Sequence, residues 1–492
     1  MKSKLTLFVI LFSIIIIKPL FSQVQLGEDL SGDSDSDEFG TSVAITSDGN
    51  RMAIGAVQND GDIGTGRVRV YDFIAGTWTQ VGSDIYGEAV GDRFGCSISL
   101  SSNGKRIAIG ALLNGGNGNA AGHVRVYELI NGAWTQLGID IDGENPGDFS
   151  GTAISLSSDG GRIAIGGSGN DENGNSSGHV RIYEWSDPIW VQLGADIDGK
   201  AAGDHLGRSV SLSSDGSILA IGAPESDVNG EFSGSAFVYK WNNGTWTQLG
   251  SDIIGENAND ALARSLSLSA DGTRLAVGAP RNSDNGSNSG HVRVFEYTGT
   301  DWVQLGASIK GEAVGDLSGT SVSLSSSGVR VAIGAPDNNN FYLSSGHTRL
   351  YEWNQSEWIQ VGDDVDGVAS FENSGTALAL SSDGRRVVIG APFNNQDGYA
   401  KGKARVFEFE AVSTLTPSDD TFVEIYPNPT SGTIQLQGNN WGPIRIVDNY
   451  GRIILNQEQE ENTINIPNLP AGVYFLIINS KGRLIKKRFF KQ

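Results

Sequence analysis

Short runs in which apolar residues alternate with small or polar residues recur along most of the chain. One stretch contains four of them: GTAISLSS at 151–158, RIAIGG at 162–167, GHVRIYEW at 178–185 and WVQLGADI at 190–197. Such alternation over four to eight residues, with Val, Ile, Tyr and Trp enriched, is typical of half-buried β-strands. A Ser-Asp-Gly sequence between the first two runs predicts a tight hairpin, so the four strands are expected to be antiparallel.

The four-strand unit repeats along the chain. Six tryptophans follow one another at intervals of 56 residues, each with a glutamine two positions later: Trp78, Trp134, Trp190, Trp246, Trp302 and Trp358. With an isolated copy of the same phrase near Gln25, the pattern gives seven units. Repetition of this kind predicts an all-β, seven-bladed β-propeller. A linear solenoid is the alternative, but its end units would need polar capping forms, and here they resemble the middle ones.

The two ends of the repeat region complement each other. The seventh unit stops at KARVFEFE, residues 403–410, with no Trp-x-Gln run behind it, whereas QVQLGEDL at 23–30 has no unit in front of it. We therefore expect the N-terminal strand to become the outermost strand of the seventh blade and to close the ring. The first blade would then begin its innermost strand near Gly40, and the propeller would span residues 23–410.

The composition adds a location and restricts the partners. Lys2 and Lys4 precede an apolar run from Leu5 to Ile17, which predicts a signal peptide over residues 1–22 and a secreted product without a membrane span. The chain carries a net charge of −22, while residues 1–22 and 424–492 each carry +3, so residues 23–423 carry −28. So acidic a body argues against nucleic acid and favours cations, basic proteins or neutral glycans as partners. Cys96 is the only cysteine and is expected to be a small packed side chain.

The repeats resemble a known family. FGTSVAITSDGNRMAIGA at 39–56 and SGTSVSLSSSGVRVAIGAPDNNN at 318–340 are similar to FG-GAP repeats of the integrin-α-like propellers. The resemblance implies a propeller used for binding or adhesion. The family often has a calcium loop, Asp-x-Asp-x-Asp-Gly, between its first two strands, but here that connection is shortened to Ser-Ser-Asp-Gly. This turn offers too few oxygen ligands, so no metal or other cofactor is expected, although acidic loops leave calcium open as an alternative.

The last 70 or so residues differ in composition from the repeats. Residues 411–423 are predicted to be a linker, and 424–492 contain enough short strands for a small β-sandwich. YPNPTSG at 426–432, DNYGR at 448–452, LPAGVYFLII at 469–478 and KKRFFK at 486–491 resemble the type A C-terminal sorting domain of the Bacteroidetes type IX secretion system. The resemblance implies recognition by the secretion machinery, through residues that would include Tyr426, Pro427, Asn428, Pro429, Gly472, Tyr474, Lys486 and Lys487. Lys486 and Lys487 have a second interpretation, as charges that protect an edge strand.

Long loops on rigid strands are where binding residues usually collect. In a propeller, the crossovers between blades and the loops between second and third strands open on the same face. An acidic residue recurs in every crossover, twelve positions after the marker glutamine: Asp37, Asp92, Asp148, Asp204, Asp260, Asp316 and Glu372. These carboxylates either bind a cation or basic ligand or cap their own turns, and repetition in every blade favours the second interpretation.

Other repeated residues invite the same structural interpretation. They are a second acidic series, Asp29, Asp84, Asp140, Asp196, Asp252 and Asp364, and the histidines His123, His179, His291 and His347, expected to be hydrogen-bonded within the sheets. Phe341 and Tyr342, in a variable polar loop, either stack on a ligand or pack onto the blade.

Catalytic motifs do not stand out. His-Glu-x-x-His, cysteine metal patterns and phosphate loops are missing from the sequence, so no catalytic residue is assigned. The first hypothesis is a secreted or cell-surface, non-catalytic binding or adhesion protein. The alternative is an extracellular polysaccharide hydrolase or lyase that uses carboxylates of the propeller's loop-bearing face.

Overall fold

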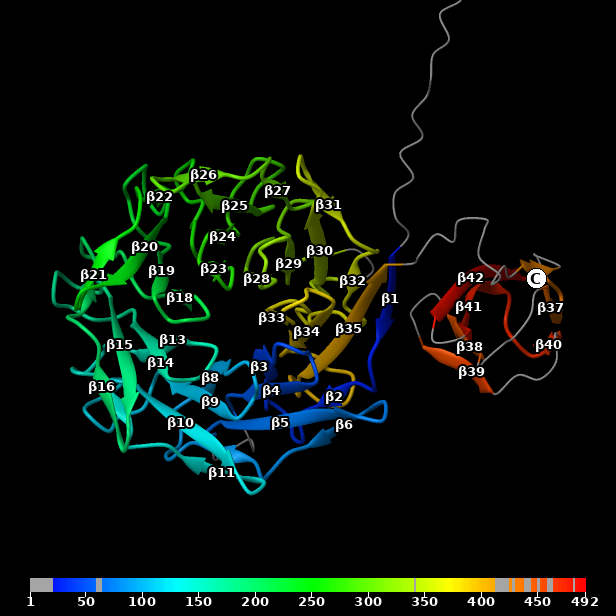
Figure 1. The fold of residues 1–492 in the computed structure, drawn as a ribbon, viewed down its shortest axis with the longest axis horizontal. Coiled ribbons are helices and arrows are strands. Elements are labelled where there is room, and N and C mark those ends of the chain that lie inside the picture. Colours follow the sequence, from blue (N-terminus) through cyan, green and yellow to red (C-terminus); the bar gives the residue numbers. More distant parts are fainter. Residues whose placement is uncertain are drawn as a thin grey trace, which may run out of the picture. The chain divides into compact units, whose positions relative to one another are not determined.

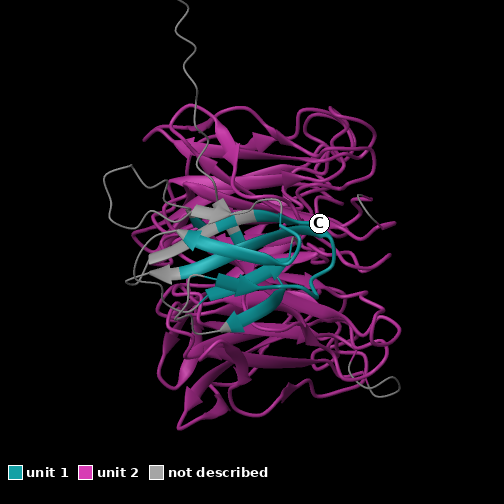
Figure 2. Ribbon diagram, turned by 90° about the vertical axis from the view of Figure 1, so that its right-hand side faces the viewer, with its two compact units in different colours: residues 1–23, 410–492 teal, residues 24–409 magenta. Residues whose placement is uncertain are grey.

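The computed structural model describes residues 21–58, 64–339, 342–411, 424–426, 430–437, 444–448, 452–457, 463–480 and 483–492. In these residues the regular structure is all β, as predicted. The chain divides into two compact units, residues 24–409 and a second unit that contains residues 410–492, coloured separately in Figure 2.

Seven antiparallel sheets form the larger unit, arranged around a common centre (Figure 1). In each blade the chain passes from an innermost strand to a second, a third and an outermost strand. The innermost strands are β3 (Phe39–Ile45), β8 (Phe94–Leu100), β13 (Ser150–Leu156), β18 (Ser209–Leu212), β23 (Ser265–Leu268), β28 (Ser321–Leu324) and β33 (Ala377–Leu380). The second strands are β4 (Arg51–Ala56), β9 (Arg106–Ala111), β14 (Arg162–Gly167), β19 (Ile218–Ala223), β24 (Arg274–Ala279), β29 (Arg330–Ala335) and β34 (Arg386–Ala391).

The outer half of each blade contains the third and outermost strands. The third strands are β5 (Arg67–Ile74), β10 (His123–Ile130), β15 (His179–Ser186), β20 (Ser235–Asn242), β25 (His291–Tyr297), β30 (His347–Trp353) and β35 (Lys403–Ala411). The outermost strands are β6 (Thr77–Gln80), β11 (Ala133–Gln136), β16 (Ile189–Gln192), β21 (Thr245–Gln248), β26 (Trp302–Gln304), β31 (Trp358–Gln360) and β1 (Phe21–Gln25). Strand β35 extends one residue into the predicted linker, and residues 412–423 lie outside the described residues.

Each blade also has a fifth strand of two residues, which the sequence pattern did not predict. These strands pair with the start of the third strand: β7 (Ile85–Tyr86), β12 (Ile141–Asp142), β17 (Ile197–Asp198), β22 (Ile253–Ile254), β27 (Ile309–Lys310), β32 (Val365–Asp366) and β2 (Leu30–Ser31). Two residues are too few to show alternation, so only the pairing reveals them.

The predicted ring closure is confirmed. Strand β1 lies beside β35 in the seventh sheet, and the Leu26 amide donates to the Val406 carbonyl over 2.8 Å. On the face formed by the tight hairpins, the Ser47 amide donates to the Ser102 carbonyl of the next blade, and this bond recurs from blade to blade. The seventh copy, from the Ser382 amide back to the Ser47 carbonyl over 3.0 Å, completes the circle.

The marker tryptophan and a small residue in the second strand join neighbouring blades. The Trp78 indole N–H donates to the Leu26 carbonyl over 2.8 Å, and Trp134 repeats this bond to Val81 over 2.9 Å. Closer to the centre, a Cβ at Gly390 would collide with the Gly40 carbonyl, so the seventh and first blades approach through a residue without a side chain. Apolar residues of the second strands fill the space between sheets, with Ile54, Ile107 and Val331 fully buried.

The smaller unit is a sandwich of two sheets, as predicted. One contains β36 (Glu424–Tyr426), β37 (Thr433–Gln437) and β40 (Thr463–Asn465). The other contains β38 (Ile444–Asp448), β39 (Ile453–Gln457), β41 (Gly472–Ser480) and β42 (Arg483–Lys491). Ile434 and Ile464 of the first sheet share one buried core with Ile446, Leu476 and Phe489 of the second.

The structure describes the predicted sorting residues only in part. Pro427, Asn428 and Pro429 lie outside the described residues. Gly472 begins β41, and Tyr474 is buried, with its hydroxyl donating to the Pro470 carbonyl over 3.0 Å. Tyr426 lies in β36, and Lys486 and Lys487 lie in β42.

Candidate functional site

Two sets of loops form one face of the propeller, here called the loop face. They are the crossovers that lead into the innermost strands and the loops that join second to third strands. Backbone hydrogen bonds connect the two sets, as from the Gly147 amide to the Asn119 carbonyl (3.0 Å) and from the Gly203 amide to the Asn175 carbonyl (2.9 Å). The opposite face carries the tight hairpins that form the circular hydrogen bonds.

The seven crossover carboxylates are buried, with exposed fractions between 0 and 7%. Asp260 shows their usual contacts: its Oδ2 accepts the Glu256 amide (3.2 Å) and the Asn257 amide (2.9 Å), and its Oδ1 accepts the Asn282 side chain (3.0 Å). Asp37 and Glu372 are also contacted by Arg67 and Arg405. These carboxylates therefore hold the crossovers in place, and a direct role in binding stays a prediction.

The second acidic series explains why glutamine accompanies the tryptophan. The Gln136 side chain donates to Asp140 over 2.6 Å, and Gln80 donates to Asp84 over 2.7 Å. Arg69 also contacts Asp84, and its Nε donates to this carboxylate over 2.9 Å. The burial of Asp84 alone would raise its pKa, but the hydrogen bonds from Arg69 and Gln80 together leave the pKa below its ordinary value.

The prediction that the repeated histidines are hydrogen-bonded is wrong for His291 and His347, which are buried and whose ring nitrogens have no hydrogen-bond partner. His179 is 1% exposed, and its Nδ1 lies 3.5 Å from Asp196 Oδ2, at the limit of hydrogen-bond length; this contact lowers the pKa of Asp196. Each of these histidines lies at the first position of a third strand, and its ring points toward carboxylates of its own blade. Desolvation lowers the pKa of His347 to about 4, so its ring is neutral at pH 7.

Arginines form a blade-specific feature that the sequence analysis missed. Arg208 and Arg264 occupy a position, just before the innermost strand, where the first, third, sixth and seventh blades have threonine. Burial lowers the pKa of both guanidiniums, and the charges of Arg208 and Arg281 contribute to bringing the pKa of Arg264 to about 10. Glu225 is the acidic group that opposes this effect, and it also lies 3.2 Å from His205 Nε2. The strongly negative net charge of residues 23–423 did not predict this local group of arginines.

Replacing Arg264 by threonine is expected to stabilise the protein. The charged form of Arg264 is disfavoured by desolvation and by like charges, so removing it should raise Tm by about 1–2 °C at pH 7. The gain should be nearly constant from pH 7 to about 9 and should begin to shrink only as the pH rises through 10, the lowered pKa of Arg264, because the folded and unfolded states differ in proton binding only above that value. Thermal melts of Arg264→Thr and of the exposed control Arg385→Thr at pH 7 and above pH 10 measure the effect. A lower Tm for Arg264→Thr would contradict it.

Exposed apolar side chains gather on the loops of the sixth and seventh blades. We call this set the aromatic sector: Tyr342 (49% exposed), Leu343 (57%), Val368 (37%), Phe371 (52%), Phe393 (40%) and Tyr399 (73%). The loops touch, since the Phe371 amide donates to the Leu343 carbonyl over 2.7 Å and the Gln396 side chain donates to the Val368 carbonyl over 3.4 Å. Other crossovers and loops of the described residues also expose large apolar side chains, for example Val90, Val228 and Val314.

The sequence analysis found one member of the aromatic sector. Tyr342 is half exposed, which leaves it available to a ligand, while Phe341 lies outside the described residues. The other members come from three loops up to 57 positions apart in the sequence, from Tyr342 to Tyr399. Each loop contributes only one or two described members and is otherwise mainly polar, so the sector becomes apparent only when the three loops are seen to adjoin.

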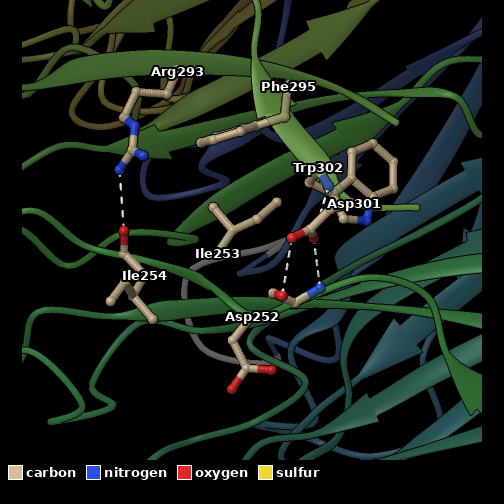
Figure 3. A pocket seen from close by; sticks show the side chains of 8 residues that line it. Asp252, Ile253, Ile254, Arg293, Phe295, Asp301 and Trp302 are labelled. Carbon is tan, nitrogen blue, oxygen red and sulfur yellow. Dashed lines mark hydrogen bonds between the residues drawn. The ribbon is translucent and has the colours of Figure 1, made fainter. Parts of the chain in front are cut away.

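A shallow hollow of about 260 Å³ lies where the fourth and fifth blades meet (Figure 3). Arg293, Phe295 and Trp302 line it, and their polar groups are engaged locally: Arg293 donates to the Ile254 carbonyl over 3.1 Å. Asp301 accepts the Ser251 amide over 2.8 Å (Figure 3). The bond from Arg293 recurs between Arg349 and the Lys310 carbonyl, so the hollow is part of the repeated contact between blades.

Family comparisons match one segment in each of the two units. Residues 424–492 match the family described as "Secretion system C-terminal sorting domain", and residues 197–239 match the family described as "FG-GAP repeat". A search of curated proteins found no match. A solved structure described as "Structure of U3-55K" aligns with 11% sequence identity over 79% of this chain and 99% of that chain, with a TM-score of 0.46.

The sorting domain indicates export to the extracellular space or the outer cell surface, and it implies interaction with the type IX secretion machinery. In the part of the chain that is described, no helix is both long and apolar enough to cross a membrane. The chain thus combines a seven-bladed β-propeller containing an FG-GAP repeat with a C-terminal sorting domain of the type IX secretion system.

Proposed function

We propose that the chain is a secreted, non-catalytic binding or adhesion protein that contacts its ligand with the aromatic sector. The observation that carries the proposal is the concentration of six exposed apolar side chains on adjoining loops of two blades. A contiguous exposed apolar area rimmed by polar residues is a common mark of a binding surface. Blade-specific residues are also what a single binding site needs, in contrast to the repeated acids.

A neutral glycan is the ligand class that fits this surface best. Ring faces of Tyr399, Phe371 and Tyr342 can stack on sugar rings, and the amide and carboxylate groups of Gln396 and Asp397 can accept or donate hydrogen bonds to hydroxyls. The acidic charge of the propeller disfavours strongly anionic chains. Export to the cell exterior brings the protein to where such glycans occur.

Replacing Tyr399 or Phe371 by alanine is expected to weaken glycan binding about tenfold each, because truncating an aromatic side chain at the centre of an interface typically costs at least 1–2 kcal/mol. Binding of the secreted protein to an array of neutral polysaccharides, followed by titration of the best ligand, measures this. Val228→Ala removes a similarly exposed apolar side chain (61%) from the loop between the second and third strands of the fourth blade and should leave affinity unchanged.

The same assay separates the alternatives. Full affinity in both aromatic variants would contradict the placement of the site. Release of reducing or unsaturated sugars would instead support the polysaccharide hydrolase or lyase. Binding to proteins alone would identify the sector as a protein interface.

A further inference from the structure

In most blades, the residue at the first position of the third strand is buried and has several carboxylates around it. That residue is Arg67, His123, His179, Ser235, His291, His347 or Lys403 from the first blade to the seventh. In the first blade, Arg67 contacts Asp33 over 2.7 Å and Asp37 over 2.6 Å. In the seventh, the Lys403 ammonium lies 3.2 Å from Asp397 and 3.5 Å from Asp29. In these two blades the chain itself supplies the cation that the carboxylates require.

The third blade has the carboxylates without such a cation at this position. His179 Nδ1 lies 3.5 Å from Asp196 Oδ2 and 3.9 Å from Glu144 Oε2. Asp198 is directly opposite His179 in the pairing of β15 with β17, and ligand atoms of His179, Asp196 and Asp198 all lie within 4.8 Å of one another. His179 is 1% exposed, its Nε2 has no hydrogen-bond partner and its Nδ1 has only the long contact to Asp196, while Asp198 Oδ1 is buried without a partner.

The spacing of these atoms suits a shared metal ion better than direct hydrogen bonds. An N–H···O hydrogen bond brings its atoms to about 2.9 Å. Two ligands of one tetrahedral ion, each about 2.0–2.1 Å from the metal, are about 3.4 Å apart. The separation of 3.5 Å between His179 Nδ1 and Asp196 Oδ2 fits the second arrangement, but it recurs between His123 and Asp140 (3.5 Å) and between His347 and Asp364 (3.6 Å), so the spacing alone does not single out the third blade.

Gly167 gives the His179 ring the room it occupies. The last residue of the second strand is glycine only in the third blade and alanine in the other six. A Cβ at Gly167 would lie 2.7 Å from both Cδ2 and Nε2 of His179, closer than side chains tolerate. The replacement of alanine by Gly167 therefore allows the His179 imidazole to occupy a position that is particular to the third blade.

The corresponding acids of the second blade are engaged, because Arg125 contacts both Glu88 and Asp140. The sixth blade resembles the third: Arg349 lies 3.4 Å from Glu312 there, as Arg181 lies 3.6 Å from Glu144, and Gly167 is what distinguishes the third blade. In the fifth blade Ser308 and Lys310 replace the two aspartates.

Other charges surround the third-blade cluster. Arg181 lies 3.6 Å from Glu144 and donates to the Asp142 carbonyl over 2.6 Å, but in the described residues it forms no ion pair with Asp196 or Asp198. Asp148 and Glu172 add negative charge nearby. Burial, together with the charges of Glu172 and Asp196, raises the pKa of Asp198.

We propose that His179, Asp196 and Asp198 bind a divalent transition-metal ion of the Zn²⁺ type, with Glu144 as a fourth ligand. One imidazole and several carboxylates form a ligand set for zinc, whereas calcium takes oxygen ligands alone. The ion occupies the place that Arg67 and Lys403 fill in the first and seventh blades. It links β15, β17 and the preceding crossover.

Zinc titration of the full-length protein after chelator treatment tests the proposal. Zn²⁺ at a hundredfold excess over its dissociation constant should raise Tm by at least about 2 °C, because an ion that binds only the folded state stabilises it. Calorimetry should give one high-affinity ion per chain, Ca²⁺ at the same concentration should have no effect, and Co²⁺ should give the visible absorption of a tetrahedral site.

Variants locate the ion. His179→Lys places an ammonium where the seventh blade has Lys403, so it should fold, keep its Tm without metal and lose the zinc response. Gly167→Ala should weaken zinc binding at least tenfold by displacing the ring. His347→Lys, the matched change in the sixth blade, should retain the response.

Two results would overturn the proposal. The first is a zinc response that persists in His179→Lys, which would place the ion elsewhere on the acidic surface. The second is a lack of zinc binding in the wild type, measured by calorimetry and by an unchanged Tm on adding Zn²⁺.

Discussion

A propeller that lacks residues 21–31 will not form a stable folded monomer. The deletion removes β1 and β2, exposes the hydrogen-bonding edge of β35 and leaves the Trp78 indole without the Leu26 carbonyl. An unpaired strand edge beside uncovered apolar side chains promotes aggregation. We expect a Tm at least 10 °C below wild type, or aggregated protein, in thermal melts and size-exclusion chromatography.

Narrower changes show whether closure itself is responsible. Leu26→Pro removes the amide that donates to Val406 and should cost about 3 kcal/mol, whereas Glu28→Ala alters an exposed residue of the same segment and should have little effect. A peptide of residues 21–31 added to the deletion variant should restore stability by strand addition, and the same peptide with Leu26→Pro should not. A deletion variant as stable as wild type would refute the closure argument.

Asp260→Ala is expected to destabilise the propeller by about 3 kcal/mol. The variant leaves the Glu256 and Asn257 amides and the Asn282 side chain without their acceptor in a buried setting, and each unsatisfied buried donor costs about 1–3 kcal/mol. Denaturant unfolding measures the loss, and hydrogen exchange should show faster exchange in the crossover at residues 255–261.

Asp363→Ala is the matched control, because Asp363 is an exposed aspartate of the same kind of repeat unit and should change stability by less than about 0.5 kcal/mol. Equal stability of Asp260→Ala and wild type would mean that the crossover carboxylates do not hold the loops. The interpretation of these carboxylates as ligand-binding groups would then be favoured.

The histidines show why the site was harder to predict than the fold. The period placed His123, His179, His291 and His347 at one strand position, but hydrogen bonding depends on which side chains surround each ring. Arg125 engages the acids of its blade, whereas Arg181 donates mainly to a backbone carbonyl. The resulting difference in charge around His123 and His179 comes from side-chain geometry, which repetition alone does not encode.

The sequence by itself determined the number of blades, the order of their strands and the closing role of residues 23–30. The strict 56-residue period of Trp78 and its counterparts indicates that one backbone geometry is repeated. The seventh unit lacks an outermost strand and residues 23–30 form an extra one, so the simplest arrangement places this extra strand in the seventh blade. The motifs of residues 424–492 likewise identified the sorting domain, because they are local in the sequence.

The tertiary structure alone decided which residues are buried and which meet. It placed the seven crossover acids inside the loops, paired the two-residue fifth strands, buried His179 beside Gly167, and exposed Phe371, Phe393 and Tyr399 on adjoining loops. These outcomes depend on contacts between loops and strands far apart in the chain. A repeat pattern describes what the blades share, whereas a site arises from the few positions where neighbouring blades differ.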